Sequence, residues 1–313
     1  MRSASAHAQD AMRRIGVMMA LDEDQAEEKV RLQALLRRLE QLGWVDGRNV
    51  RIQVRSARGS MARSREIAAE FAALAPDVII STGSTATAAI KRATPSIPVV
   101  FALVNEPVAQ GFVQSLQRPG GNITGFTLID FTLILKLVEL LKSIDPGMSR
   151  VGLMFNPENY SAYNDYVDRL QAEPRLGVDV VQSTARSPAE IFAAIAALAA
   201  QPRAGLAILP DGGFTLTNQA PIRAALERHP MPAIAFWRQF VADGGLMSYG
   251  PDTIDVFRRS ADYADRILKG AKPAELPVQQ PVKFDLVISA KAAAVLGLAI
   301  PPTLLAQADE VTD

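Results

Sequence analysis

The sequence predicts an α/β protein with two successive doubly wound parallel sheets, and three observations support this fold class. Short apolar runs that fit buried strands alternate with amphipathic stretches that fit helices, from residue 14 to residue 268. The alternation restarts after the stretch GGNITGF, residues 120–126, which divides it into two units of similar size. The length of 313 residues accommodates two domains, each with its own core.

The first unit is expected to contain four strands and the helices between them. The apolar runs predict strands over 14–21, 49–57, 77–83 and 97–104. Helices are expected over 25–42, 62–75 and 86–93, and the first of these is closed by Gly43. A strand and helix alternation of this kind gives a parallel sheet that is covered on both faces.

The second unit repeats the pattern. Strands are expected over 150–156, 177–183, 204–210, 231–236 and 245–250, with helices over 130–143, 163–172, 188–200, 215–228 and 252–268. No short-period repeat accompanies this duplication, so a solenoid is not expected.

Composition excludes several classes of function. Lysine plus arginine equals aspartate plus glutamate at 33 each, and no block of like charge suggests nucleic acid or an anionic membrane as a partner. The chain has no cysteine and only two histidines, which leaves little material for a thiolate nucleophile, a histidine triad or a metal site. No phosphate-loop or dinucleotide motif is present, and no run of about 18 apolar residues could span a membrane. We expect a small-molecule or protein partner and no cofactor or metal.

Ligands of doubly wound sheets bind beyond the carboxyl ends of the strands, so the residues that follow each strand are the candidate site. The candidate ligand-binding residues are Asp22, Gly83, Ser84, Thr85, Asn105, Glu106, Tyr160, Asp211, Phe214, Arg238 and Tyr249.

The stretch DVIISTGSTATAAI, residues 77–90, passes from a buried strand into a helix through small residues. Ser84 and Thr85 are thereby expected at a helix N-terminus, where free N–H groups and the helix dipole attract an anion. The alternative is that Ser81 or Ser84 simply caps the helix.

The N-terminal segment has features of export. Ala6-His7-Ala8 followed by Gln9 fits the end of a secretory signal, although no apolar region precedes it. We expect residues 1–11 to be the remnant of a signal peptide or a disordered tail.

The ordered set of stretches RIGVMMALDEDQ, LGWVDGRNVRI, LAPDVIISTGSTA, RPGGNITGF, VADGGLMSYG, DRILKGAKPAELPVQQPVKFDLVIS and AAAVLGLAIPPTLLAQADEV resembles the substrate-binding proteins of ABC importers. More narrowly, it resembles the group that includes tryptophan- and tyrosine-binding members. The resemblance covers nearly everything from Arg14 to Val311. It implies a non-enzymatic, periplasmic protein that delivers a small ligand to membrane permease subunits.

The resemblance also implies the type I periplasmic-binding fold, with two lobes joined by three crossovers that close on ligand. The first lobe would comprise residues 12–124 plus 250–273, and the second 125–249 plus 274–313. Crossovers are expected near 124–127, 249–252 and 272–282. The helix 252–268 would return to the first lobe, and KFDLVIS would finish in the second.

The resemblance suggests a role for Ser84 and Thr85, and position after a strand suggests the roles of the other residues. Ser84 and Thr85 would meet a ligand carboxylate, and Asp211 would pair with a ligand amine or cap a turn. Arg238 would clamp a second carboxylate, or pair structurally with Asp243 or Glu227. The aromatic residues would sandwich a flat ring or pack in the core; these are Tyr160, Phe214, Trp237 and Tyr249.

Two departures from the family pattern put tryptophan itself in doubt as the ligand. Many relatives have Ser or Thr, Asp and Pro after the fourth strand, where this chain has Asn105, Glu106 and Pro107. Tryptophan-binding members have a Thr-Asp-Asn turn where this chain has Pro210, Asp211 and two glycines.

Two other classes of function are alternatives that the same residues support less well. An enzyme would need two acid/base groups at one substrate carbon, and only Asp22 with Glu23 pairs in that manner. A ligand sensor of the lactose-repressor type would need a helix-turn-helix before the first strand, where about thirteen residues stand.

Overall fold

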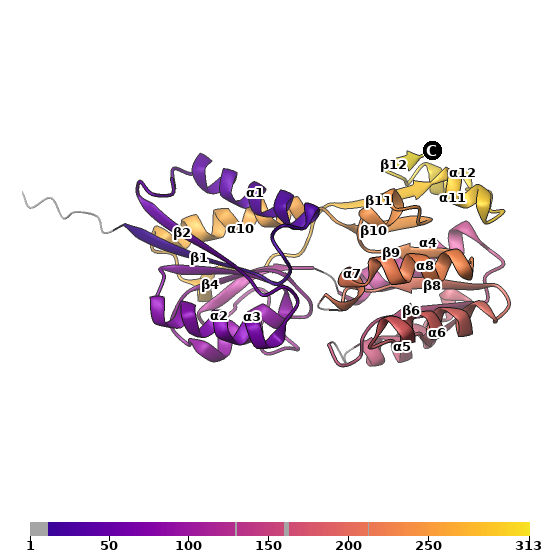
Figure 1. Ribbon diagram of the computed structural model, residues 1–313, viewed down its shortest axis with the longest axis horizontal. Helices are drawn as coiled ribbons and strands as arrows, with labels where there is room; N and C mark the ends of the chain where they lie inside the picture. The colour runs from indigo at the N-terminus through magenta and orange to yellow at the C-terminus, as the bar shows by residue number, and fades with distance from the viewer. Residues whose placement is uncertain (1–11, 129, 160–162, 212) are drawn as a thin grey trace, which may run out of the picture. The chain divides into compact units, whose positions relative to one another are not determined.

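The computed structural model describes residues 12–128, 130–159, 163–211 and 213–313. The chain forms two compact α/β units (Figure 1). The first unit comprises residues up to Thr127 together with Ile254–Gln279, and the second comprises Leu128–Thr253 together with Gln280–Asp313. The chain therefore passes from one unit to the other at 127–128, 253–254 and 279–280.

The first unit is built on a five-stranded parallel sheet in the order β2-β1-β3-β4-β5. Its strands are β1 (Arg13–Met19), β2 (Val50–Ser56), β3 (Val78–Thr82), β4 (Val99–Val104) and β5 (Ile123–Thr127). The helices are α1 (Ala26–Gln41), α2 (Met61–Leu74), α3 (Gly83–Ala93) and α10 (Thr253–Leu268), with the 3-10 turn η2 (Pro273–Glu275). This strand order places the reversal of direction, where doubly wound sheets bind ligands, between β1 and β3.

Successive residues of β3 serve opposite faces of this sheet. Val78 and Ile80 pack into one cluster with residues of α1 and α10, and Ile79 packs into another with residues of α2 and α3. Figure 1 shows the two pairs of helices on opposite sides of the sheet. A strand that is buried on both faces has a continuous apolar sequence, and this explains the run Val78-Ile79-Ile80.

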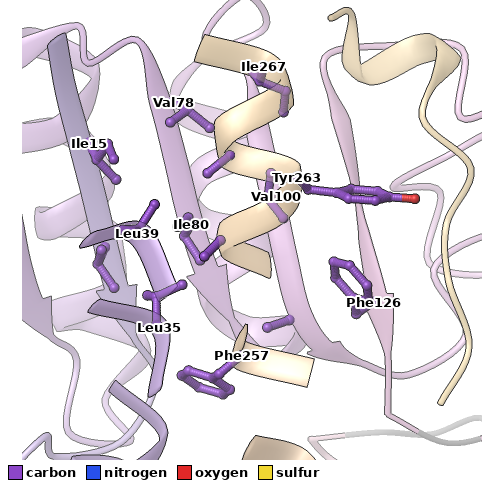
Figure 2. Packing of buried hydrophobic residues seen from close by; sticks show 14 of the residues in the cluster. Ile15, Leu35, Leu39, Val78, Ile80, Val100, Phe126, Phe257, Tyr263 and Ile267 are labelled. Carbon is purple, nitrogen blue, oxygen red and sulfur yellow. The ribbon is translucent and has the colours of Figure 1, made fainter. Parts of the chain in front are cut away.

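The helix α10 completes the core although it follows the second unit in the chain. Figure 2 shows Phe257, Tyr263 and Ile267 of α10 beside strand residues such as Val100. Tyr263 lies 4.8 Å from Phe126 between ring centroids. The residues of this helix from Ile254 onward group with the first unit.

The second unit contains a seven-stranded sheet in the order β12-β11-β10-β9-β8-β6-β7. The strands are β6 (Arg150–Met154), β7 (Asp179–Gln182), β8 (Ala204–Ile208), β9 (Ala233–Ala235), β10 (Met247–Pro251), β11 (Phe284–Ser289) and β12 (Glu310–Thr312). Read as β7-β6-β8-β9-β10, five parallel strands repeat the order of the first sheet. The reversal of direction thus falls between β6 and β8. The strand β11 runs antiparallel to β10, so this sheet is parallel only in part.

The helices of the second unit include α4 (Phe131–Ile144), α5 (Tyr163–Gln171), η1 (Pro174–Leu176), α6 (Pro188–Ala199), α7 (Phe214–Thr217), α8 (Gln219–Arg228), α9 (Gln239–Ala242), α11 (Ala290–Val295) and α12 (Pro302–Leu305). Within the described ranges, no helix is long and apolar enough to cross a membrane.

Several elements differ from the sequence predictions, and the short helices α9, α11 and α12 were not predicted. The helix expected over 215–228 is two helices, because the backbone of Asn218 leaves the helical region between α7 and α8. The stretch ITGFT, which was not predicted as a strand, forms β5, and β12 near the C-terminus was not predicted either. The run ITGFT has only two strongly apolar residues and EVT has one, so neither gives the apolar pattern of a buried strand.

The last parallel strand of each unit contains a glycine that lies against the backbone of the neighbouring strand segment. A Cβ at Gly125 would lie 2.0 Å from the carbonyl oxygen of Phe101, and one at Gly250 would lie 1.8 Å from that of Phe236. No side chain fits at either place, because the neighbouring backbone would have to move. Close backbone approach therefore explains these two glycines of the predicted crossovers.

Candidate ligand-binding site

The start of α3 lies at the carboxyl edge of the first sheet. Gly83 opens the helix with a φ of +73°, and Thr82 is its N-cap without a side-chain hydrogen bond to the helix. The hydroxyl of Thr82 instead accepts a 2.8 Å hydrogen bond from the backbone N–H of Ala20, after β1. The hydroxyl of Ser81 lies 2.8 Å from that of Thr87. Neither Ser81 nor Ser84 caps α3, so that alternative is wrong.

Ser84 and Thr85 lie in the first turn of α3, which begins three residues earlier than the expected Ala86. Both are half-buried, and the first turn contains no acidic residue. The backbone dipoles therefore leave positive potential at this helix end that no carboxylate of the first turn offsets. Such an end can accept an anionic group.

Gln110, which was not among the predicted site residues, fixes the position of this helix start. Its side-chain Nε2 donates to the hydroxyl of Ser84 at 3.0 Å and to the backbone carbonyl of Asn105. The bonds join the end of β4 to the first turn of α3. Gln110 stands five residues beyond Asn105, in a turn where residue position alone gave no signal.

The structure brings six of the predicted residues to this one edge, since β1, β3 and β4 are neighbours in the sheet. Asp22 follows β1 and forms an ion pair with Arg58 at 3.3 Å. Asn105 and Glu106 follow β4; Asn105 is 5% exposed and Glu106 has a φ of +41°. The six residues are Asp22, Gly83, Ser84, Thr85, Asn105 and Glu106.

In the second unit Asp211 is fully buried beyond the end of β8. One carboxylate oxygen accepts a 2.7 Å bond from the backbone N–H of Asn156, after β6. The other accepts from the backbone N–H of Thr215 at 3.0 Å and from its hydroxyl at 3.2 Å. Burial raises the pKa of Asp211, and these hydrogen bonds oppose the shift. Asp211 thus acts as a turn cap here, the alternative role that the sequence left open.

The same edge is braced by Tyr163, which the sequence analysis did not single out. Its buried hydroxyl donates to the carbonyl of Pro210 at 2.5 Å, and its ring meets Phe155 edge-on at 5.2 Å. Through these bonds Pro210 and Asp211 are connected to α5, to α7 and to the end of β6.

The predicted aromatic residues occupy different places. Tyr249 stacks on Phe284 with ring centroids 5.6 Å apart, and burial followed by the charge of Asp309 raises its pKa. Phe214 opens α7 and is half-buried. Tyr160 lies outside the described residues.

Arg238 does not take the structural partners that were expected for it. It forms an ion pair with Glu310 of β12, whereas Asp243 accepts from Gln239 and Glu227 pairs with Arg223. The preceding Trp237 is buried and lines a cavity with residues that come before β9 and β10. Its ring therefore lies away from the carboxyl edge at which the sequence had placed it.

The described residues contain no group of three or more His, Cys, Asp or Glu side chains that could hold a metal ion. The chemistry of both edges is that of hydrogen bonding, helix dipoles and aromatic contact, which suits reversible binding of a small molecule.

Comparison with known proteins gives consistent matches over almost the whole chain. A family model described as ABC transporter substrate binding protein matches residues 14–312. A curated tyrosine-binding protein of Clostridioides difficile (strain R20291) is 24% identical over 254 residues, which are 81% of this chain and 72% of the relative.

Solved structures show the same fold. A conserved domain protein from Vibrio cholerae O1 biovar eltor has a TM-score of 0.88 at 28% identity, covering 96% of this chain and 100% of that one. An ABC domain in complex with L-Trp from Streptococcus pneumonia has a TM-score of 0.86 at 22% identity, with the same coverage. A ligand-free, open substrate binding protein from Clostridium difficile has a TM-score of 0.73 at 23% identity, covering 96% and 99%.

Proposed function

This chain belongs to the family of ABC transporter substrate-binding proteins, and from that premise we propose that it is the extracytoplasmic solute-binding component of an ABC importer. Its ligand is a small carboxylate, either an amino acid or an aromatic acid. Its macromolecular partners are the membrane permease subunits of that importer, and it catalyses no reaction itself.

The proposal of a carboxylate ligand rests on the start of α3. This helix has no side-chain cap and no acidic residue in its first turn, and half-buried Ser84 and Thr85 stand there. A carboxylate at this end would receive charge-assisted hydrogen bonds, each worth about 1.5–3 kcal/mol. Neutral Thr82 and Gln110 fix the surrounding chain without adding a negative charge that would repel the ligand.

Aromatic amino acids are the first ligands to test. One relative is named a tyrosine-binding protein, and a similar solved structure is described as a complex with L-Trp. Of the predicted residues, Phe214 and Tyr249 supply half-buried aromatic surface in the second unit. We propose that they contact the apolar body of the ligand while α3 receives its carboxylate, and that the two units close on it.

A thermal-shift screen across amino acids, aromatic acids, sugars and polyamines tests the ligand class. A ligand at 100 times its dissociation constant stabilises the folded state by about 2.7 kcal/mol, which raises the melting temperature measurably. We expect shifts with amino acids or aromatic acids. Shifts with sugars or polyamines alone would overturn the carboxylate proposal.

Small-angle X-ray scattering tests the closure. We expect the radius of gyration to fall when the ligand found in the screen is added at saturation. An unchanged scattering profile at saturation would argue against closure while leaving the ligand class intact, because the thermal shift reports binding separately.

A further inference from the structure

The chain crosses between the two units three times, and residues beside all three crossovers are held by one face of α10. In chain order, the crossovers lie at 127–128, 253–254 and 279–280. Asp255, Arg259 and Tyr263 stand four positions apart on α10, so their side chains share a face of the helix. All three belong to the first unit.

Arg259 contacts a residue beside each crossover. Its Cζ lies 5.1 Å from the ring centroid of Phe126, which comes just before the first crossover. Its Nη2 donates to Oε1 of Gln279, at the third crossover, over 3.3 Å. Its Nη1 lies 3.8 Å from Oδ2 of Asp255, beyond the second crossover, which is an ion-pair distance but too long for a hydrogen bond. The side chain is 24% exposed, so water screens these contacts only in part.

The first and third crossovers are also joined through the backbone. The N–H of Thr127 donates to the carbonyl of Gln279 at 2.9 Å, and the N–H of Gln279 donates to the carbonyl of Gly125 at 2.9 Å. One turn further along α10, the hydroxyl of Tyr263 donates to the carbonyl of Pro277 at 2.6 Å. The helix that the chain enters at the second crossover is thus attached to two crossovers that are bonded to each other.

Residues after the third crossover make corresponding contacts within the second unit. The side-chain amide of Gln280 donates to Oδ2 of Asp130, which follows the first crossover, at 3.2 Å. Nζ of Lys283 lies 3.9 Å from Oδ2 of Asp252, which precedes the second crossover. The backbone N–H of Asp252 also donates to the carbonyl of Lys283 at 3.2 Å. The third crossover is therefore linked to the other two in each of the two units.

The third crossover has little conformational freedom of its own. Gln279 and Gln280 stand between Pro277 and Pro281. Each proline fixes its own φ and disfavours the helical conformation in the residue before it. Because Gln279 is bonded within the first unit and Gln280 within the second, a rotation of one unit against the other is confined to few backbone dihedrals here.

We propose that Arg259 is a positioning residue for closure: it holds the three crossovers together in the first unit, so that they bend as one hinge. This inference rests on the closure in the proposed function and identifies a residue that limits it. Three crossovers that moved independently would give the ligand-free protein a wider range of conformations, and ordering them on binding would cost entropy. Crossovers that are already held together have less of this freedom to lose when a ligand binds.

Spin labels test this inference without any ligand, because the chain has no cysteine of its own. Ala62→Cys on α2 and Ala172→Cys after α5 place one label at an exposed position of each unit. Double electron–electron resonance then measures the distribution of distances between the two labels in the ligand-free protein. The test variant is Arg259→Met, which keeps an unbranched side chain and removes the charge and the hydrogen-bond donors.

Arg258→Met is the matched control, because it removes a charge from the neighbouring position of the same helix. Arg258 pairs with Asp255 and is 59% exposed. In the part of the chain that the structure describes, it has no hydrogen bond or ring contact with Phe126 or Gln279. A difference between the two variants therefore reports the contacts of Arg259 with the first and third crossovers, and not the loss of a charge at this end of α10.

We expect Arg259→Met to widen the distance distribution relative to Arg258→Met, and Arg259→Lys, which keeps the charge, to give an intermediate width. Hydrogen exchange at the backbone amides of Thr127 and Gln279 should accelerate about tenfold in Arg259→Met, because the loss of one charged hydrogen bond makes local opening easier by at least that factor.

Equal widths for Arg259→Met and Arg258→Met would overturn the proposal. Faster exchange at Thr127 and Gln279 with an unchanged width would make Arg259 a local structural residue, which also overturns it. If Arg259→Met does not fold, Arg259→Lys is compared with Arg258→Met by the same criterion. Failure of the proposed closure would be seen separately, as a wild-type distance that stays the same when the ligand found in the thermal-shift screen is saturating.

Discussion

In each unit, a backbone N–H that follows one strand donates a hydrogen bond to a side chain at the end of the neighbouring strand. The two units differ in the side chain that accepts this bond. In the first unit the backbone N–H of Ala20, after β1, donates to the hydroxyl of Thr82. In the second the backbone N–H of Asn156, after β6, donates to the carboxylate of Asp211. Both bonds bridge the strands at which the sheet order reverses.

The change of acceptor alters what each helix start can bind. Asp211 also accepts from the N–H of Thr215, so the negative charge is built into the start of α7. Thr82 is neutral and gives no hydrogen bond to α3. The second unit thus holds an anion of its own at this helix start, whereas the first unit leaves the equivalent position without one. This difference is the reason for proposing that the first unit receives the carboxylate of a ligand.

The largest effect is expected from removing the internal anion with Asp211→Ala. The buried N–H groups of Asn156 and Thr215 would lose their acceptor at about 1–3 kcal/mol each, so unfolding in urea should require about 2–6 kcal/mol less. Thr217→Ala, at an exposed position of the same helix, is the control and should stay within about 0.5 kcal/mol of wild type. If the Asp211→Ala protein were as stable as the control, the hydrogen bonds to Asp211 would contribute little to stability.

Thr82→Asp converts the first edge into a copy of the second. Aspartate is a favoured N-cap residue and can still accept from Ala20, so the protein should fold. Its carboxylate would occupy the positive end of α3, and affinity for the carboxylate ligand of the screen should fall about 100-fold, or about 2.7 kcal/mol. Calorimetric titration measures this, with Thr82→Ser as the variant that should bind normally. Undiminished affinity of the aspartate variant would move the ligand away from α3.

Ser84→Leu blocks the same position by bulk instead of charge. Carboxylate affinity should fall at least tenfold, about 1.4 kcal/mol, in the same titration. Stability without ligand should change little, because Ser84 is only half-buried. Normal binding together with a loss of about 1–2 kcal/mol of stability would make Ser84 a structural residue only. Arg238 would then be the next candidate for the carboxylate.

The smallest effect is the pH dependence contributed by Asp211. Its pKa is raised by burial, so the folded state binds this proton more tightly than the unfolded chain does. The stabilising contribution is therefore present below the unfolded pKa of about 3.9 and is lost as pH rises through the folded value. Relative to Asp211→Asn, the wild-type free energy of unfolding should decline over that interval. A relative increase would mean that the three hydrogen bonds outweigh burial.

Local pattern was enough to predict most of the fold. The runs around Val78 and Leu206 are apolar because both faces of their strands are buried, and that signal lies within each segment. The helix start at Ser84 was likewise predicted from its small residues. The break at Asn218 was missed because one residue with a non-helical backbone hardly disturbs an amphipathic pattern.

The site was less predictable, since its contacts join distant residues. Arg238 forms an ion pair with Glu310, seventy-two positions away, and Asp211 accepts a hydrogen bond from Asn156, fifty-five positions away. Gln110 was missed for a similar reason, because its role depends on a turn that brings it back to Ser84. Position after a strand identifies the edge, whereas the partners of each side chain depend on packing.

The return of α10 to the first unit has a consequence for folding during synthesis. The ribosome produces residues 128–253 before this helix, which at about 5–20 residues per second takes on the order of ten seconds. During that interval the sheet face with Val78 and Val100 lacks the cover of Phe257 and Ile267. The five parallel strands of the second unit, β6 to β10, are complete in the nascent chain before that cover is made. The core of the first unit is therefore completed only after the parallel strands of the second unit have been synthesised. Until then the uncovered face of the first sheet is the surface at which the nascent chain is prone to aggregate.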